Sequence, residues 1–157
     1  MIDWPEEISR FMRRTVPVFI HLAAAKPGAA PFVCRGYGFR LEPKAGVLWT
    51  YILKSQWLRL TDYSEPPGEL SALLTSGVDN ESYQFKGRFA DLRPLAREDV
   101  LALEEQRRRV ELHIPNLVPL IHVLPSDCVS AGFRVKAVYS QTPGPGAGLP
   151  VMERSGE

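Results

Sequence analysis

Short runs of apolar, aromatic and β-branched residues, separated by glycine and proline turns, recur along this chain. In the clearest run, residues 83–92, Tyr83, Phe85 and Phe89 alternate with polar neighbours, as in a strand with one buried face. Runs of this length favour strands over helices. The pattern therefore predicts a mainly β fold of short antiparallel strands, either a barrel or a sandwich.

About six strands are expected in all. They cover residues 16–22, 31–41, 47–53, 70–78, 83–92 and 128–139. The segment 70–78 also has leucines at helical spacing, but its short length and bounding glycines favour a strand. A turn at residues 43–46 joins the second and third strands into a hairpin.

Helices are expected at three places beside these strands. Asp3 and Pro5 mark the start of a short amphipathic helix. Residues 54–60 are predicted to form a helical turn directly after the third strand. The longest helix is predicted over residues 96–112, where pairs such as Glu104 and Arg108 are spaced for a solvated face.

The composition predicts one globular domain with no nucleic-acid or membrane partner. Apolar residues make up 45% and charged residues 24% of the 157 residues, as in ordinary globular domains. A formal net charge of +1 provides no broad positive field to attract nucleic acid or anionic lipid. No leader or membrane-spanning run is visible, so a cytoplasmic location is expected.

The domain is expected to span residues 1–148, followed by a flexible tail over residues 149–157. Residues 143–148 consist of proline, glycine and alanine, a composition that predicts neither helix nor strand. This segment is expected to lie against a surface or to be disordered.

The residues that most often carry chemistry are scattered. Cys34 and Cys128 are far apart, and His21, His113 and His122 share no ligand spacing, so neither a disulfide framework nor a metal site is predicted. No nucleophile elbow, phosphate-binding loop or zinc-protease motif occurs either. These motifs therefore identify no catalytic residue.

The order of elements over residues 32–90 does indicate a family. It is carried by the glycines Gly36 and Gly38, the strand Leu48-Trp49-Thr50-Tyr51, its continuation Lys54-Ser55-Gln56, and the run Tyr83-Gln84-Phe85-Lys86-Gly87. In this order the chain resembles the pyridoxamine 5'-phosphate oxidase-like family of flavin-binding split barrels. Residues 141–148 are also similar to the tails of uncharacterised members.

The resemblance implies a split β-barrel that works as a homodimer and binds flavin mononucleotide (FMN) at the subunit interface. By resemblance, the cofactor-binding residues are Thr50, Tyr51, Lys54, Ser55, Gln56, Arg59, Gln84 and Lys86. The first two would line the ring through their backbone, and Ser55 and Gln56 would meet the phosphate. Lys54 and Arg59 would lie near enough to add charge. Lys86 would stabilise the negative charge of the reduced ring.

Two departures argue against pyridoxamine phosphate oxidation itself. Where the oxidase has an Arg-Lys pair for the phosphate, this chain has Gln56-Trp57, and the oxidase's substrate-contacting segment after the last strand is absent. The expected function is therefore an FMN-dependent oxidoreductase of unknown small-molecule substrate. The alternatives are a non-catalytic binding module for flavin, haem or another flat ligand, and a purely structural or protein-interaction barrel.

Overall fold

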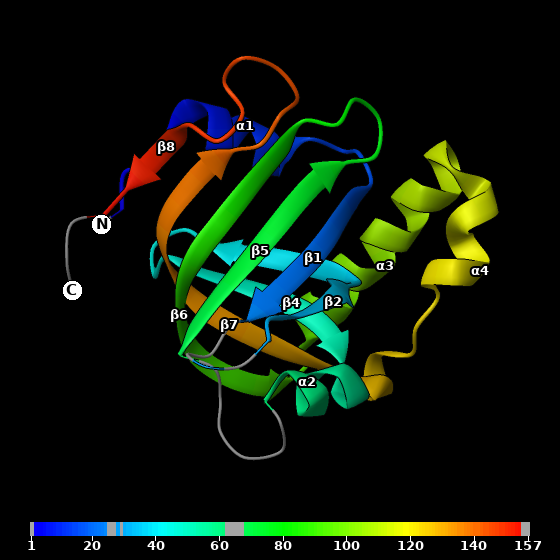
Figure 1. The fold of residues 1–157 in the computed structure, drawn as a ribbon. Coiled ribbons are helices and arrows are strands. Elements are labelled where there is room, and N and C mark those ends of the chain that lie inside the picture. The colour runs from blue at the N-terminus through cyan, green and yellow to red at the C-terminus, as the bar shows by residue number, and fades with distance from the viewer. Residues whose placement is uncertain (1, 25–27, 29, 62–67, 155–157) are drawn as a thin grey trace.

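A computed structural model describes residues 2–24, 28, 30–61 and 68–154. The helices are α1 (Glu6–Arg13), α2 (Lys54–Leu60), α3 (Arg97–His113) and α4 (Val118–Ile121), with short 3₁₀ turns η1 (Pro115–Leu117) and η2 (Pro125–Asp127). The strands are β1 (Val18–Ala24), β2 (Phe32–Gly36), β3 (Gly38–Glu42), β4 (Val47–Leu53), β5 (Glu69–Ser76), β6 (Ser82–Pro94), β7 (Cys128–Ser140) and β8 (Pro150–Glu153). Figure 1 shows the strands curled into a barrel with helices at its rim.

The barrel closes through one continuous segment of chain. The eight strands form one antiparallel sheet in the order β2-β1-β5-β6-β7-β4-β3, with β8 added to β7. The two ends of this path, β2 and β3, are separated only by Tyr37, whose backbone N–H donates to the Tyr51 carbonyl at 2.8 Å. The single strand predicted over residues 31–41 is therefore divided at Tyr37, and each half pairs with a different neighbour.

Glycine makes this closure possible, because other parts of the barrel lie very close to the dividing point. A Cβ atom at Gly36 would lie 2.8 Å from the Ile20 side chain, and one at Gly38 would lie 2.7 Å from the Tyr51 ring. Glycine at these two positions leaves the space that the Ile20 and Tyr51 side chains occupy.

The core fills the barrel and is closed at one end by α1. Ile20, Leu22 and Phe85 point inward and are at most 1% exposed, and Phe11 of α1 packs edge-on against Tyr83 with ring centroids 5.0 Å apart. Burial alternates with period two at the start of β6. Tyr83 and Phe85 lie on the inward face, as predicted, and Gln84 and Lys86 lie on the other.

A second, smaller core lies outside the barrel, between α3 and β4. Trp49 and Tyr51 are at most 5% exposed and form this core with Val47 and Leu103. Since Leu48, Thr50 and Ile52 point into the barrel, β4 is buried on both faces. That explains why its sequence is an almost uninterrupted apolar run.

The far half of β7 differs from the prediction. A regular strand over residues 128–139 would place Val135, Ala137 and Tyr139 on one face, but Val135 and Val138 are the buried residues. The pairing of β6 with β7 shifts register between Lys86 and Gly87, which places an extra residue in β7 and reverses the faces beyond it.

The end of the chain also differs from the expected tail. Residues 150–153, placed in an unstructured tail by the sequence analysis, form β8 and pair with β7. The loop before β8 is held by the Gly148 N–H, which donates to the Ser140 carbonyl at 2.7 Å. With the division at Tyr37, β8 raises the strand number to eight. Within the described ranges, no helix is long and apolar enough to cross a bilayer.

Candidate functional site

Thr50 and Tyr51, predicted to line a cofactor ring, are both fully buried in β4. The Thr50 hydroxyl donates to the Ala131 carbonyl at 3.2 Å. Because β4 lies between β3 and β7, the backbone groups of both residues pair with neighbouring strands. In a single chain they therefore form part of the barrel wall.

The Tyr51 hydroxyl instead belongs to a buried polar cluster around Asp99, which is 0% exposed. Asp99 accepts hydrogen bonds from the Tyr51 hydroxyl at 2.8 Å, the Arg40 Nε at 3.3 Å and the Ala96 backbone N–H at 2.8 Å. Arg93 lies 3.6 Å away. Burial and the bond to Asp99 both raise the pKa of Tyr51, so its hydroxyl stays protonated and donates.

The sequence analysis did not identify this cluster. Asp99 is the third residue of α3, where an acidic side chain commonly caps the helix, so its position alone does not indicate a buried cluster. The pairing of β3 with β4 brings Arg40 to it, and no local pattern reports such a contact.

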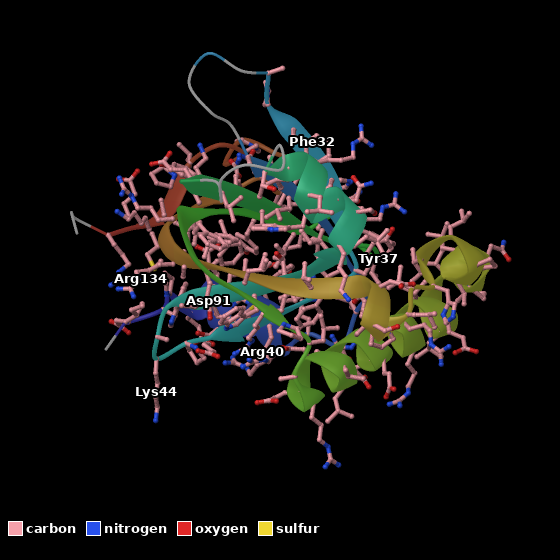
Figure 2. All side chains as sticks on the ribbon, turned by 90° about the horizontal axis from the view of Figure 1, so that it is seen from below. Phe32, Tyr37, Arg40, Lys44, Asp91 and Arg134 are labelled. Carbon is pink, nitrogen blue, oxygen red and sulfur yellow. The ribbon has the colours of Figure 1, made fainter. Side chains whose placement is uncertain are left out.

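The remaining residues of the predicted phosphate site lie on α2. Lys54, Ser55 and Arg59 are exposed, and Gln56 is half-buried. The Arg59 guanidinium lies over the Phe32 ring at 5.4 Å. Figure 2 shows Phe32 beside α2, at the rim of the barrel.

Gln84 and Lys86 lie on the outer face of β6, on the same side as each other. The Gln84 side chain donates to the Ser71 hydroxyl at 3.0 Å and accepts from the Gln141 amide at 3.2 Å. The Lys86 ammonium lies 5.1 Å from the centre of the Tyr139 ring. Gln84 is thus held in place, whereas Lys86 is exposed.

Lys86 borders the first of two hollows that concern the predicted site. This hollow, which we call the Lys86 hollow, has a volume of about 420 Å³. It is lined by Ala23, Ala24, Pro31, Glu69, Leu70, Ser71, Lys86, Gly87 and Lys136. Small apolar groups therefore form its floor, and charged groups stand at its edge.

The sheet register brings Arg59 and Lys86 to the same rim of the barrel. Phe32, Ala24, Leu70 and Gly87 are successive partners across four strands. At a strand spacing of about 4.8 Å, the two ends of this row are roughly 14 Å apart. Arg59 stacks on the first residue of the row, and Lys86 precedes the last.

Lys54 belongs to a different hollow, on another side of α2. This second hollow, which we call the Arg93 hollow, has a volume of about 400 Å³. It lies where α2, the end of β6, the first turn of α3 and η2 meet. Within one chain, the predicted residues therefore do not form a single site. Arg59 and Lys86 lie at one rim, Lys54 lines the Arg93 hollow, and Thr50 and Tyr51 lie in the barrel wall.

One face of the sheet has no helix over it. Phe19, Ala23, Ser71, Leu73 and Thr75 point outward from β1 and β5 and are half-buried. In Figure 1 this face is turned toward the viewer, and none of the described helices lies in front of it. We call these five residues the open sheet face; none of them is charged, but the exposed His21 lies among them, opposite Leu73 of β5 and Arg35 of β2.

Both cysteines are buried free thiols, Cys34 in β2 and Cys128 in β7. Burial raises the pKa of Cys34 to about 11. Burial and the nearby Asp127 raise the pKa of Cys128 to about 11, although Lys54 acts in the opposite direction. Neither thiol is ionised at neutral pH, as expected for apolar packing residues.

These thiols predict a loss of stability in alkaline solution. Above pH 9.0, the ordinary pKa, an unfolded chain releases both protons while the folded chain keeps them up to about pH 11. The thiol contribution to the urea midpoint should therefore be constant between pH 7 and 9 and fall as the pH rises toward 11. The variant Cys34→Ala/Cys128→Ala should show a shallower decline, and an equally steep one would contradict the assignment.

Comparison with known proteins identifies the fold. No family model matches the sequence, and no curated protein matches it either. HupZ from Group A Streptococcus superimposes with a TM-score of 0.54 at 13% identity, over 94% of this chain and 100% of that one. Rv2991 from Mycobacterium tuberculosis gives 0.56 at 17% identity, over 100% and 95%.

General stress protein 26 from Bacillus anthracis gives a TM-score of 0.50 at 12% identity, over 86% of this chain and 91% of that one. These similarities extend over nearly the whole chain. The chain therefore has the split-barrel fold of the pyridoxamine 5'-phosphate oxidase-like proteins, which confirms the fold that the sequence predicted.

Proposed function

We propose that two copies of this chain bind FMN between them and hold its ring for oxidation or reduction of a small molecule. The observation that carries this proposal is the Lys86 hollow, which has an apolar floor and cations at its edge, at one end of an uncovered sheet face. When bound, FMN supplies the hydride-transfer chemistry. The chain's own residues bind, orient and charge-balance the cofactor.

The residues around the Lys86 hollow fit the two parts of FMN. A flat ring needs small apolar neighbours, which Ala23, Ala24 and Leu70 provide. A phosphate needs cationic and neutral donors, which Arg59 and Ser55 offer from α2. Glu69 is the one acid among the described lining residues, and two lysines outnumber it.

Lys86 has the role that most affects the chemistry. Its exposed ammonium stands at the edge of the hollow, where it would face a ring bound against the floor. A cation there stabilises the charge of a reduced ring and so favours its reduction. Gln84 is held by hydrogen bonds with Ser71 and Gln141, and it would keep a fixed polar group beside the Lys86 ammonium.

The open sheet face is the surface that we assign to the second copy. Its half-buried Phe19 and Leu73 are flanked by the exposed His21, and Arg35 of β2 lies beyond His21. A self-complementary partner would cover the apolar residues with a neutral His21 and would leave Arg35 at the rim of the interface. Lys86 and Gln84 lie at the border of this face, so the partner copy would close the hollow from above. Thr50, Tyr51, Lys54 and Gln56 of each chain would then support the site from the barrel wall and α2.

A non-catalytic binding module is the second candidate. The described lining of the hollow contains no histidine, cysteine or tyrosine, the residue types that most often serve as proton-transfer groups or nucleophiles beside Asp, Glu and Lys. Mixing the FMN-loaded protein with NADH or NADPH separates the two functions. Rapid bleaching of the flavin absorbance supports the oxidoreductase, and an unchanged spectrum supports the binding module.

The site itself is tested by titrating the flavin-free protein with FMN and following the quenching of flavin fluorescence. Lys86→Met and Arg59→Met should each weaken binding about tenfold, because each removes a charged partner worth about 1.5 kcal/mol. Lys44→Met, at an exposed turn on another part of the barrel, is the matched control (Figure 2) and should bind as the parent does. Equal affinity in all four proteins would overturn the proposed site.

A further inference from the structure

We propose that the Arg93 hollow is a second binding site, which takes a small organic carboxylate with a flat apolar body. The hollow lies apart from the Lys86 hollow and shares no lining residue with it. The inference does not depend on FMN binding, and Lys54 is the only residue that the two proposals have in common.

The walls of the Arg93 hollow are apolar and come from four separate elements. They are formed by Leu92, Pro94, Leu95, Val100, Pro125 and Val129. A hollow of about 400 Å³ is at the lower end of the range for small-molecule sites. The walls therefore select a ligand whose body is apolar and about the size of one or two fused rings.

The charged residues that line this hollow are both cations. Lys54 enters from the start of α2 and Arg93 from the end of β6, and the described lining contains no aspartate or glutamate. The other polar groups are the Ser126 hydroxyl and the Cys128 thiol. An anionic group is therefore the natural partner, and a carboxylate matches a guanidinium better than a single-point acceptor does.

Arg93 is held in place but lacks acceptors. Its guanidinium stacks on the Trp49 ring at 3.8 Å, and its Nη2 lies 3.6 Å from Asp99. Its Nε and Nη2 are buried and have no hydrogen-bond partner among the described residues. Because these two nitrogens are shielded from solvent, an anion in the hollow would reach the guanidinium from the exposed side of the side chain, which is 31% accessible.

The nearby acids give Arg93 one partner, the ion pair with Asp99 at 3.6 Å. Asp99 lies beneath Arg93 and is shared with Arg40, which also pairs with Glu42 at 3.3 Å. Asp127 is exposed, lies beside Cys128 and is not part of the lining. A ligand that enters from solvent therefore meets Lys54 and Arg93 before any carboxylate of the protein.

The probe for this site is 2-naphthoate, compared with the neutral 2-naphthamide of the same shape. In ¹H–¹⁵N NMR spectra of the full chain, naphthoate should shift the backbone amides of Leu92, Arg93 and Leu95 and of residues 126–129. The amide should bind at least about tenfold more weakly, because it lacks the charge that the two cations recognise.

Variants then assign the effect to the hollow. Lys54→Met and Arg93→Met should each weaken naphthoate binding about fivefold or more, and Ser126→Trp, an exposed position at the hollow, should abolish it by filling the space. Lys44→Met is the control and should bind normally. If Arg93→Met fails to fold, the naphthoate affinities of Lys54→Met and Ser126→Trp still show whether the ligand binds in the hollow.

The proposal is overturned if naphthamide binds as well as naphthoate, if the shifted amides lie elsewhere, or if Ser126→Trp binds normally. Loss of FMN binding in Lys86→Met with naphthoate binding intact would support both sites as separate. Naphthoate binding without any FMN binding would support this site alone.

Discussion

Asp99→Ala should lower the free energy of unfolding by about 3–5 kcal/mol, because it leaves two half-buried arginines and a buried hydroxyl without their acceptor. The carboxylate is 0% exposed and accepts from Tyr51, Arg40 and the Ala96 backbone. It thereby ties the start of α3 to β3 and β4. Urea unfolding at pH 7, followed by circular dichroism, measures the change.

Asp91→Ala is the matched control. Asp91 is exposed, and its carboxylate accepts a hydrogen bond from the adjacent Leu92 N–H at 2.9 Å (Figure 2). Its removal should cost less than about 1 kcal/mol. A loss below about 1 kcal/mol for Asp99→Ala as well would mean that the cluster does not hold α3 in place.

Leu73→Arg should separate the two copies and release FMN in the same step. Leu73 lies at the centre of the open sheet face, so a two-fold partner would place two arginines against each other and against apolar groups. We expect the dimer dissociation constant to rise at least about a hundredfold, because an unpaired charge is costly to bury. Sedimentation velocity measures the oligomer, and flavin fluorescence measures the cofactor.

Leu112→Arg provides the comparison. Leu112 is 77% exposed near the end of α3, so an arginine there stays in solvent and should change neither readout. If Leu73→Arg remains dimeric, the open sheet face is not the interface. If it becomes monomeric but keeps FMN at full affinity, the cofactor does not depend on the second copy.

The elements that the sequence predicted well are those whose pattern is local. The strand Val47–Leu53 and the helix Lys54–Leu60 have the predicted bounds, because an apolar run followed by a helical spacing is complete within a few residues. The alternation in β6 was equally clear. The strand Pro150–Glu153 was missed because four residues carry too little pattern, and its stability comes from pairing with β7.

The candidate site could be predicted only in part, for the same reason. Lys86 and Arg59 were identified from neighbouring residues, but their shared rim depends on the register of four strands. The sequence around Arg93 and Asp99 did not predict that either residue belongs to a site, because each acts through contacts with distant parts of the chain. The bulge in β7 likewise changes which residues face inward without any mark in the sequence.

The central claim, that two copies hold FMN between them, is tested most directly by native mass spectrometry of the protein after addition of FMN. The account predicts a species with the mass of two chains and two FMN molecules, and no single chain that retains FMN. A single chain carrying FMN, or a dimer that binds none, would contradict it.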